Sequence, residues 1–163
     1  MALRPDRIIN DATIEHFMSA TAERGGVVCL AVASPHAASG TAMDLAENTV
    51  AYAADASGQT PRGVLLNDVV NLDLTRQHAN WHKDEVQVGG KVTVAPQCTV
   101  VTDWVYPGQT IIPGQRAYVA DSGYFSNTDL TNDDGAVVHD RIVGTFVTGK
   151  NEDGFCRVRV NIQ

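Results

Sequence analysis

Apolar and polar residues alternate along much of the chain with the period of a β-strand. The clearest case is the predicted strand 155–162, FCRVRVNI, in which from position 156 onward every second residue is apolar and the residues between are charged or carry an amide. Such alternation places one face of a strand in a core and the other in water. A second strand is predicted at 142–148, and the polar, glycine-containing segment 149–154 joins the two as a hairpin.

Other segments have the length and composition of short strands. They lie at 27–33, 49–54, 64–72, 86–94, 98–105, 116–120 and 124–126. Glycine, proline, asparagine and aspartate are frequent between them and predict turns. Short strands at close spacing are typical of an all-β barrel or sandwich, which is the fold class we expect.

The N-terminal segment has a different pattern. Residues 1–9 contain Pro5 and two arginines and predict an extended arm without a core of its own. Asn10, or the residue after it, is a candidate cap for a short helix with Ile14, Phe17 and Met18 on one face. A helix of this length is unstable alone and has to pack on the rest of the chain. We expect removal of the arm to leave folding nearly unchanged.

The two halves of the sequence resemble each other. AYAADASG at 51–58 matches AYVADSG at 117–123, and a Gly-Gly pair precedes each of them. Downstream, 63–66 corresponds to 144–147, after an insertion in the second half. The repeated order predicts a duplicated antiparallel β-barrel or sandwich module, with Tyr52 and Tyr118, and likewise Gly63 and Gly144, in equivalent strands. The predicted organisation is an arm and short helix at 1–24, a first β module at 25–75, a polar connector at 76–88 and a second β module at 89–163.

Composition excludes some partners. The 163 residues carry a net charge of −7, and the basic residues are scattered. A nucleic-acid surface needs a concentrated basic face, so we expect no nucleic-acid partner. No apolar run reaches the roughly 18 residues of a membrane span, and we expect no membrane partner. The N-terminus has no signal-peptide pattern, which predicts synthesis in a cytoplasm.

The cysteines predict no disulfide and no metal centre. Cys29, Cys98 and Cys156 are far apart, odd in number and outside any C-x-x-C pattern. Each lies in an apolar, strand-like segment, where cysteine behaves as a small hydrophobic residue. We expect three buried, unreactive thiols.

The polar connector holds the remaining candidate chemistry. His78 and His82 have the spacing of two metal ligands on a helix, but a third ligand at a usable spacing is missing. A polar contact surface anchored by Trp81 is the favoured interpretation. Lys83 adjoins the carboxylates at 84 and 85, a pattern that favours an intersubunit ion pair over acid–base catalysis.

No sequence motif points to catalysis or to a bound ion. Asp129 to Asp140 only partly fits a calcium loop, because its glycine is displaced by one position and its last residue is not glutamate. Nucleophile and phosphate-loop motifs are also missing. We therefore expect a protein that is not an enzyme and that carries no cofactor.

Three stretches carry a resemblance to a known family. They are 22–28 (AERGGVV), 63–94 and 151–155 (NEDGF), and the most specific parts are LNDVV at 66–70 and HKDEVQ at 82–87. Through them most of the chain resembles the head decoration, or cement, proteins of tailed phages of the cyanophage and marine-phage type. The resemblance implies a β-rich virion protein on the outer capsid surface, generally a homotrimer, without a cofactor and with the major capsid protein as partner.

These expectations lead to a set of predicted contact residues. They are Arg4, Arg7, Ile8 and Ile9 in the arm, and Arg76, His78, Trp81, His82 and Lys83 in the connector. Two alternatives stay open. One is a capsid or tail component of another kind, and the other is a small metal-binding β-barrel or enzyme that uses His78, His82 and His139.

Overall fold

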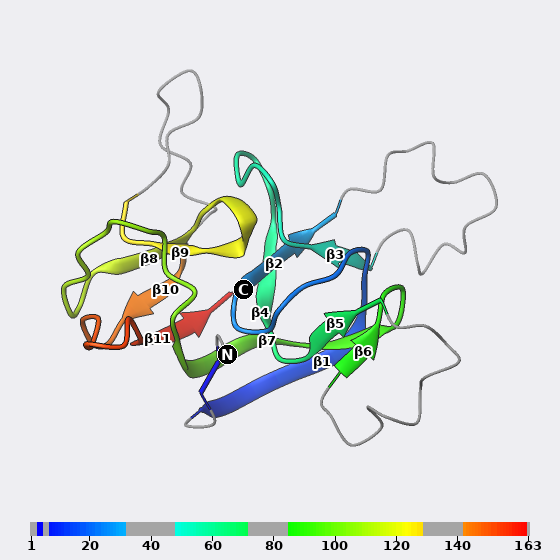
Figure 1. Cartoon of the computed structure of the whole chain (residues 1–163), viewed down its shortest axis with the longest axis horizontal. Coiled ribbons are helices and arrows are strands. Elements are labelled where there is room, and N and C mark those ends of the chain that lie inside the picture. Colours follow the sequence, from blue (N-terminus) through cyan, green and yellow to red (C-terminus); the bar gives the residue numbers. More distant parts are fainter. Residues whose placement is uncertain (1–2, 5–6, 32–47, 72–84, 129–141, 163) are drawn as a thin grey trace.

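A computed structural model describes residues 3–4, 7–31, 48–71, 85–128 and 142–162 (Figure 1). These residues contain β-strands and one turn of 3-10 helix, η2 (Asp121–Gly123), which confirms the predicted all-β class. The strands are β1 (Ile8–Met18), β2 (Val27–Leu30), β3 (Thr49–Ala51), β4 (Pro61–Leu65), β5 (Asp68–Val70), β6 (Glu85–Gln87), β7 (Lys91–Thr102), β8 (Arg116–Val119), β9 (Phe125–Ser126), β10 (Ile142–Phe146) and β11 (Cys156–Asn161). Among the described residues, no helix is long and apolar enough to cross a membrane.

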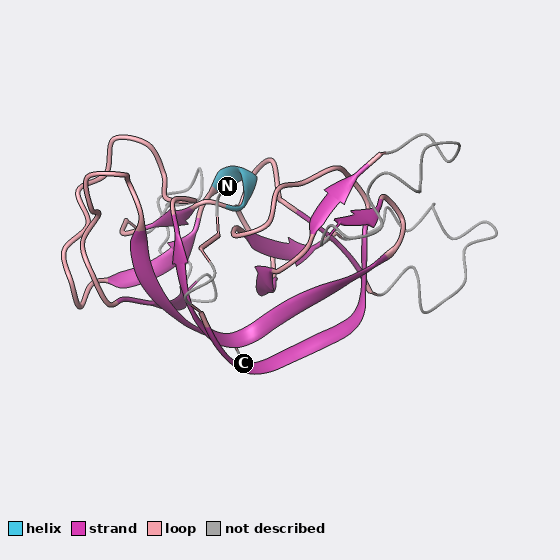
Figure 2. Ribbon diagram, turned by 60° about the horizontal axis from the view of Figure 1, so that its bottom comes forward, coloured by secondary structure: helices cyan, strands magenta, loops and turns pink. Residues whose placement is uncertain are grey.

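Nine of these strands form one mixed sheet in the order β1-β3-β2-β4-β7-β11-β10-β8-β9. Because β1 pairs with β7 as well as with β3, the first five strands of this order close into a ring. Figure 2 shows two long, curved strands below the rest of the molecule, in keeping with the extended β1–β7 ladder. The parallel pair β5 and β6 forms a separate two-stranded sheet beside the ring.

The sheet contains two groups of strands: the ring, and the series β7, β11, β10, β8 and β9. β7 belongs to both groups, because it pairs with β1 and β4 of the ring and with β11 of the series. The sequence predicts two strands here, at 86–94 and 98–105, whereas the structure has the short β6, a turn at Gly89 and Gly90, and then one continuous strand of 12 residues. Proline at position 96 suggests a break. The strand continues past Pro96 because its ladder with β1 shifts register there, and a bulge tolerates the missing N–H.

The second group of strands also curls back on itself. From β7 it continues through β11, β10, β8 and β9, and an isolated parallel bridge joins Phe125 of β9 to Val105, just beyond the end of β7. The Phe125 N–H donates to the Trp104 carbonyl at 2.9 Å, and the Tyr106 N–H donates to the Phe125 carbonyl at 2.8 Å. The segment after β7 therefore stands next to β9.

The predicted C-terminal hairpin is confirmed. β10 and β11 are antiparallel, with Gly144 opposite Val160 and Phe146 opposite Val158. In their connection the Asn151 side-chain oxygen accepts hydrogen bonds from the Asp153 and Phe155 N–H groups at 3.1 and 2.8 Å. This is the local chemistry by which asparagine stabilises a turn.

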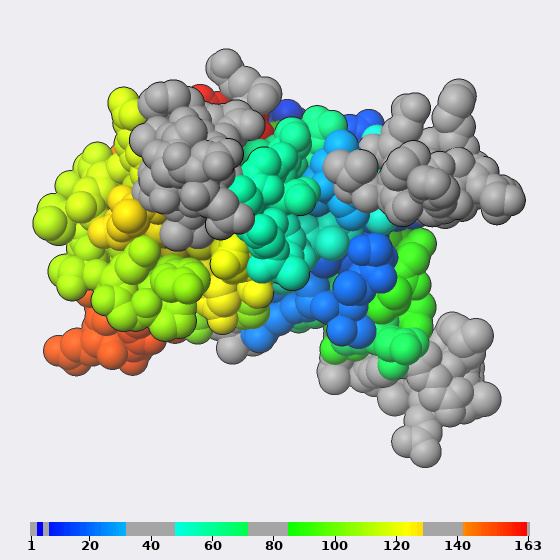
Figure 3. All heavy atoms as spheres, turned by 90° about the horizontal axis from the view of Figure 1, so that it is seen from above, coloured from blue at the N-terminus to red at the C-terminus, as the bar shows by residue number. Residues whose placement is uncertain are grey.

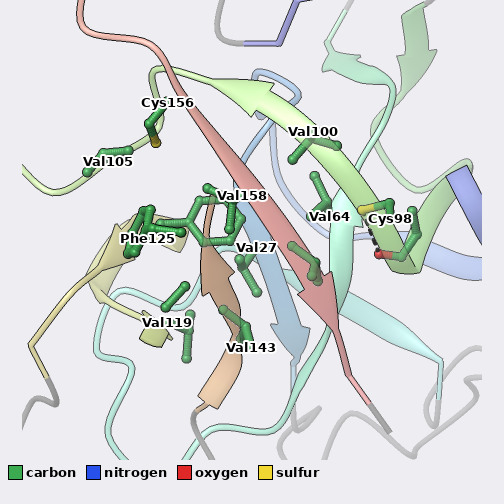
Figure 4. Close-up of a cluster of buried hydrophobic side chains, with 14 of the residues drawn as sticks. Val27, Val64, Cys98, Val100, Val105, Val119, Phe125, Val143, Cys156 and Val158 are labelled. Carbon is green, nitrogen blue, oxygen red and sulfur yellow. Dashed lines mark hydrogen bonds between the residues drawn. The ribbon is translucent and has the colours of Figure 1, made fainter. Parts of the chain in front are cut away.

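Two hydrophobic cores lie on the two sides of the wall that β2 and β4 form. Val64 belongs to the larger core, with residues of β7, β11, β10, β8 and β9, whereas the next residue, Leu65, belongs to the smaller core inside the ring. Figure 4 shows the larger core, in which Val27 and Val64 face Val158 and Phe125. Both residues of the Val64–Leu65 pair are fully buried, so β4 has no solvent-facing side at this point.

The three cysteines are buried thiols, as the sequence predicts. Cys98 and Cys156 belong to the larger core, and burial raises the pKa of both thiols to about 12. A thiol with so high a pKa holds almost no thiolate at neutral pH, so these two cysteines are poor nucleophiles.

The predicted short helix with Ile14, Phe17 and Met18 on one face is wrong, because these residues belong to strand β1. Ile14 is 66% exposed, so it does not join Phe17 and Met18 in one buried face. The ladder with β7 gives the backbone of β1 its hydrogen bonds, and tertiary pairing overrides a weak helical pattern.

The arm is also more closely attached to the body than the sequence suggests. Leu3 is 2% exposed, belongs to the larger core and forms a bridge with Thr102. Ile8 and Ile9 start strand β1 opposite Thr99 and Cys98. The arm was predicted to lack a core of its own, and the structure shows that its Leu3 is buried in the larger core of the chain.

The predicted duplication is not confirmed. Its alignment makes β2 equivalent to β7, β3 to β8 and β4 to β10. In the structure β2 pairs with both β3 and β4, but β7 pairs with neither β8 nor β10. Tyr118 lies within β8, whereas Tyr52 follows the end of β3.

Candidate contact surface

The predicted contact residues fall into two sets, of which the structure describes one. Arg4, Arg7, Ile8 and Ile9 lie within the described residues. The connector residues lie outside them, and so does the third histidine of the metal-binding alternative. These undescribed candidates are Arg76, His78, Trp81, His82, Lys83 and His139. Within the described ranges, no three or more histidine, cysteine or carboxylate side chains are grouped as metal ligands.

Arg4 is held by its own chain. Its N–H donates to the Val101 carbonyl at 2.9 Å, and its guanidinium donates to the Asp153 carboxylate at 2.8 Å. The same guanidinium lies 4.2 Å from the centre of the Phe155 ring. Because the Arg4 and Asp153 side chains are 44% and 66% exposed, water screens their ion pair and its contribution to stability is small. The Arg4 guanidinium thus has an acidic partner, Asp153, in the same chain.

A surface cavity of about 500 Å³ opens beside Arg4, next to the turn between β10 and β11. Lys150 and Arg157 also line it, which gives the cavity three basic side chains. Cys156 lies in its wall but has a raised pKa, as described above. The described lining of the cavity is thus basic, and its cysteine is a poor nucleophile.

β1 is the most exposed apolar feature of the described chain. Ile8 and Ile14 are 64% and 66% exposed, and Ile9 is 40% exposed. Every residue from Ile8 to Ala12 is exposed, so both faces of this part of the strand meet solvent. Figure 1 shows β1 along the lower border of the molecule. The predicted contact residues Ile8 and Ile9 therefore lie on a surface that a partner can reach, and Ile14, which was not predicted, extends it.

His16 is a residue of interest that sequence reasoning missed. It is 5% exposed, its Nδ1 makes no hydrogen bond within the described residues, and its Nε2 lies 4.0 Å from the Glu15 carboxylate. It lines a cavity of about 240 Å³ together with Glu15 and Arg62. Burial lowers the pKa of His16, Glu15 opposes that effect, and Arg62 adds to it. No spacing in the sequence singles this histidine out.

An aromatic cluster joins the two groups of strands. Trp104 stacks on Tyr124 with ring centres 5.1 Å apart, and its other neighbour is Tyr52 at 5.7 Å. The Tyr52 hydroxyl donates to the Glu23 carbonyl at 2.6 Å and accepts from the Gly26 N–H at 3.1 Å. Burial raises the pKa of Tyr52, so its hydroxyl stays protonated.

This cluster has a structural role. A Cβ at position 26 would stand 2.6 Å from the Trp104 ring, so only glycine fits beneath it. Figure 3 shows the face on which the first half of the chain, in blue to cyan, adjoins residues near 120 in yellow. We interpret the cluster as packing between the two groups of strands.

A scan against known protein families gave no match, and a search of curated proteins found no similar sequence.

Proposed function

We propose that this chain is a virion structural protein, a decoration or cement protein that binds the outer surface of an icosahedral phage head. Its partners are the major capsid protein and two further copies of itself in a homotrimer. It is made in the host cytoplasm and ends on the outer capsid surface. It is not an enzyme and uses no cofactor. The two groups of strands that share β7 serve as its two β modules.

The single observation that carries this proposal is the exposed row of isoleucines on β1. A group of exposed apolar side chains on one strand favours a protein contact. Ile8 and Ile9 are within the segment predicted to contact the capsid or a neighbouring subunit, and their exposure leaves them available to such a partner. The sequence resemblance to head decoration proteins supports the choice of a capsid. A decoration protein stabilises a shell by burying surface across the boundaries between capsid subunits.

Two measurements test the proposal. Native mass spectrometry of the purified protein is expected to show a trimer without stoichiometric metal. Co-sedimentation with undecorated capsids is expected to show saturable binding, with decorated capsids as the control. A stable monomer that fails to bind capsids would overturn the proposal. One equivalent of metal, lost together with stability on chelation, would favour the alternative that uses His78, His82 and His139.

A further inference from the structure

One edge of strand β1 lacks a partner strand within the described parts of the chain. On one side β1 pairs with β7 from Ile8 to Phe17. On the other side only Phe17 and Met18 pair, with Thr49 and Val50 of β3. Over 8–15 the second edge therefore has no partner strand among the described residues, and its outward-facing backbone N–H and C=O groups are open to another strand. Such an edge is a template for the addition of another strand.

The sequence of β1 is complementary to itself in antiparallel orientation. When two copies of the strand pair around Asp11, Ile8 of each copy lies opposite Ile14 of the other. The same register places Arg7 of each copy opposite Glu15 of the other. Apolar and oppositely charged cross-strand pairs both stabilise a sheet. In this register Asp11 is the only charged residue that lies opposite a like charge, because it faces Asp11 of the other copy at the centre of the pair.

We propose that the edge of β1 binds β1 of a second copy of this chain, antiparallel, around a two-fold axis. The inference rests on the proposed function, in which many copies lie side by side on one shell, and the self-complementary sequence of β1 favours another copy over a capsid subunit as the partner of this segment. The two isoleucine pairs and the two Arg7–Glu15 pairs set its register. A two-fold contact of this kind pairs like surfaces and cannot close a ring of three, so it joins copies that belong to different trimers.

The contact is expected to be weak in solution. Register shifts between β1 and β7 follow Ile9 and Thr13, and at both places β1 carries the extra residue. Such bulges interrupt an edge and shorten the ladder that it can form with another strand. On a capsid, many copies held side by side raise the effective concentration, so a weak contact between neighbours is reinforced.

The test is a charge exchange measured by sedimentation velocity over a concentration series into the millimolar range. The wild type is expected to gain a species with twice the mass of its basic unit. Arg7→Glu and Glu15→Arg each place like charges opposite one another and are expected to weaken this association. The double variant carrying both changes restores opposite charges and is expected to restore it. Asp11→Asn removes the central repulsion and is expected to tighten association about two- to fivefold, the usual effect of one cross-strand pair.

Ile14→Lys provides a second test, because it places a charge on the exposed edge and is expected to abolish the doubling. Melting temperatures close to that of the wild type show that these surface variants are folded. Absence of any doubling overturns the inference, and so does a double variant that associates no better than the single ones. These outcomes are separate from those of the proposed function. A trimer that never doubles removes only the β1 contact, whereas a monomer that doubles but binds no capsid removes only the virion role.

Discussion

At the scale of single residues, His16 is the clearest titratable group that the fold disturbs. Its imidazole is buried beside Glu15, with Arg62 also near, and desolvation lowers its pKa from the ordinary value of 6.5. The lowered pKa means that the folded protein disfavours the protonated ring. The unfolded chain has no such preference and takes up a proton as soon as the pH falls below about 6.5.

We predict that the free energy of unfolding falls as the pH drops below about 6.5 and that His16 contributes to this fall. Above that pH the ring is neutral in both states and contributes no pH dependence. Below it the unfolded state binds the extra proton, until the pKa of the folded state is reached. Thermal melts between about pH 8 and about pH 5 measure the effect, because this range spans the histidine pKa. His16→Gln, which does not titrate, is expected to lose less stability over the range. Equal losses in both proteins would show that other groups cause the pH dependence.

The sequence was a good guide to some single residues and a poor guide to others. Burial of Cys98 and Cys156 follows from their apolar strand neighbours, because alternation within a strand decides which face a side chain takes. Burial of His16 does not follow in this way, because His16 lies where the exposed part of β1 ends and the pairing of β1 with β3 begins. Such a position is set by tertiary pairing, which one sequence does not display.

At the scale of elements, the N-terminal segment combines a buried anchor with an exposed strand. Leu3 is 2% exposed and reaches the larger core, whereas Ile8, five residues later, is 64% exposed. Backbone bonds hold both residues near β7, through the Leu3–Thr102 bridge and the β1 ladder. Their side chains therefore have different roles, one in folding and one at the surface.

We predict that Leu3→Ala lowers the free energy of unfolding by about 2–5 kcal/mol, the range for a leucine removed from a core. Ile8→Ala serves as the matched control and is expected to change it by less than about 0.5 kcal/mol, as for surface substitutions. Urea denaturation followed by circular dichroism measures both. Equal, small effects of the two changes would mean that Leu3 contributes nothing to the core in solution.

Elements were predictable where local pattern and tertiary structure agree. The hairpin of β10 and β11 has strict alternation in β11 and an asparagine-stabilised turn, and both signals are local. The short N-terminal helix was predicted from Ile14, Phe17 and Met18, whose helical spacing is weak evidence over so short a segment. The chain instead extends this segment, because β7 supplies a ladder that the sequence does not reveal. The predicted repeat was not confirmed for the same reason, because similar sequence segments can pair with different neighbouring strands.

At the scale of the whole molecule, the two cores are mechanically connected. Adjacent residues of β4, Val64 and Leu65, reach into different cores, and both are fully buried. β7 pairs with strands of both groups, and the contact between Tyr52 and Trp104 spans them. If one core opened alone, β4 would lose burial on one face and β7 would lose part of its ladder. The described chain therefore lacks a boundary along which one core can melt without the other.

We predict that the chain unfolds in a single cooperative transition and that damage to either core destabilises both. Leu65→Ala, in the smaller core, is expected to lower the free energy of unfolding by about 2–5 kcal/mol. Val64→Ala, in the larger core, removes fewer atoms and is expected to lower it by about 1–3 kcal/mol.

Two probes test whether the transition is single. In a Trp81→Phe background the fluorescence reports Trp104, which belongs to the aromatic cluster, while far-ultraviolet circular dichroism reports all strands. Both signals are expected to move to the same lower midpoint in each variant, because a two-state transition gives coincident curves for every probe. A Leu65→Ala curve that splits into two steps, with Trp104 following only the later one, would show instead that the ring of strands around the smaller core unfolds on its own.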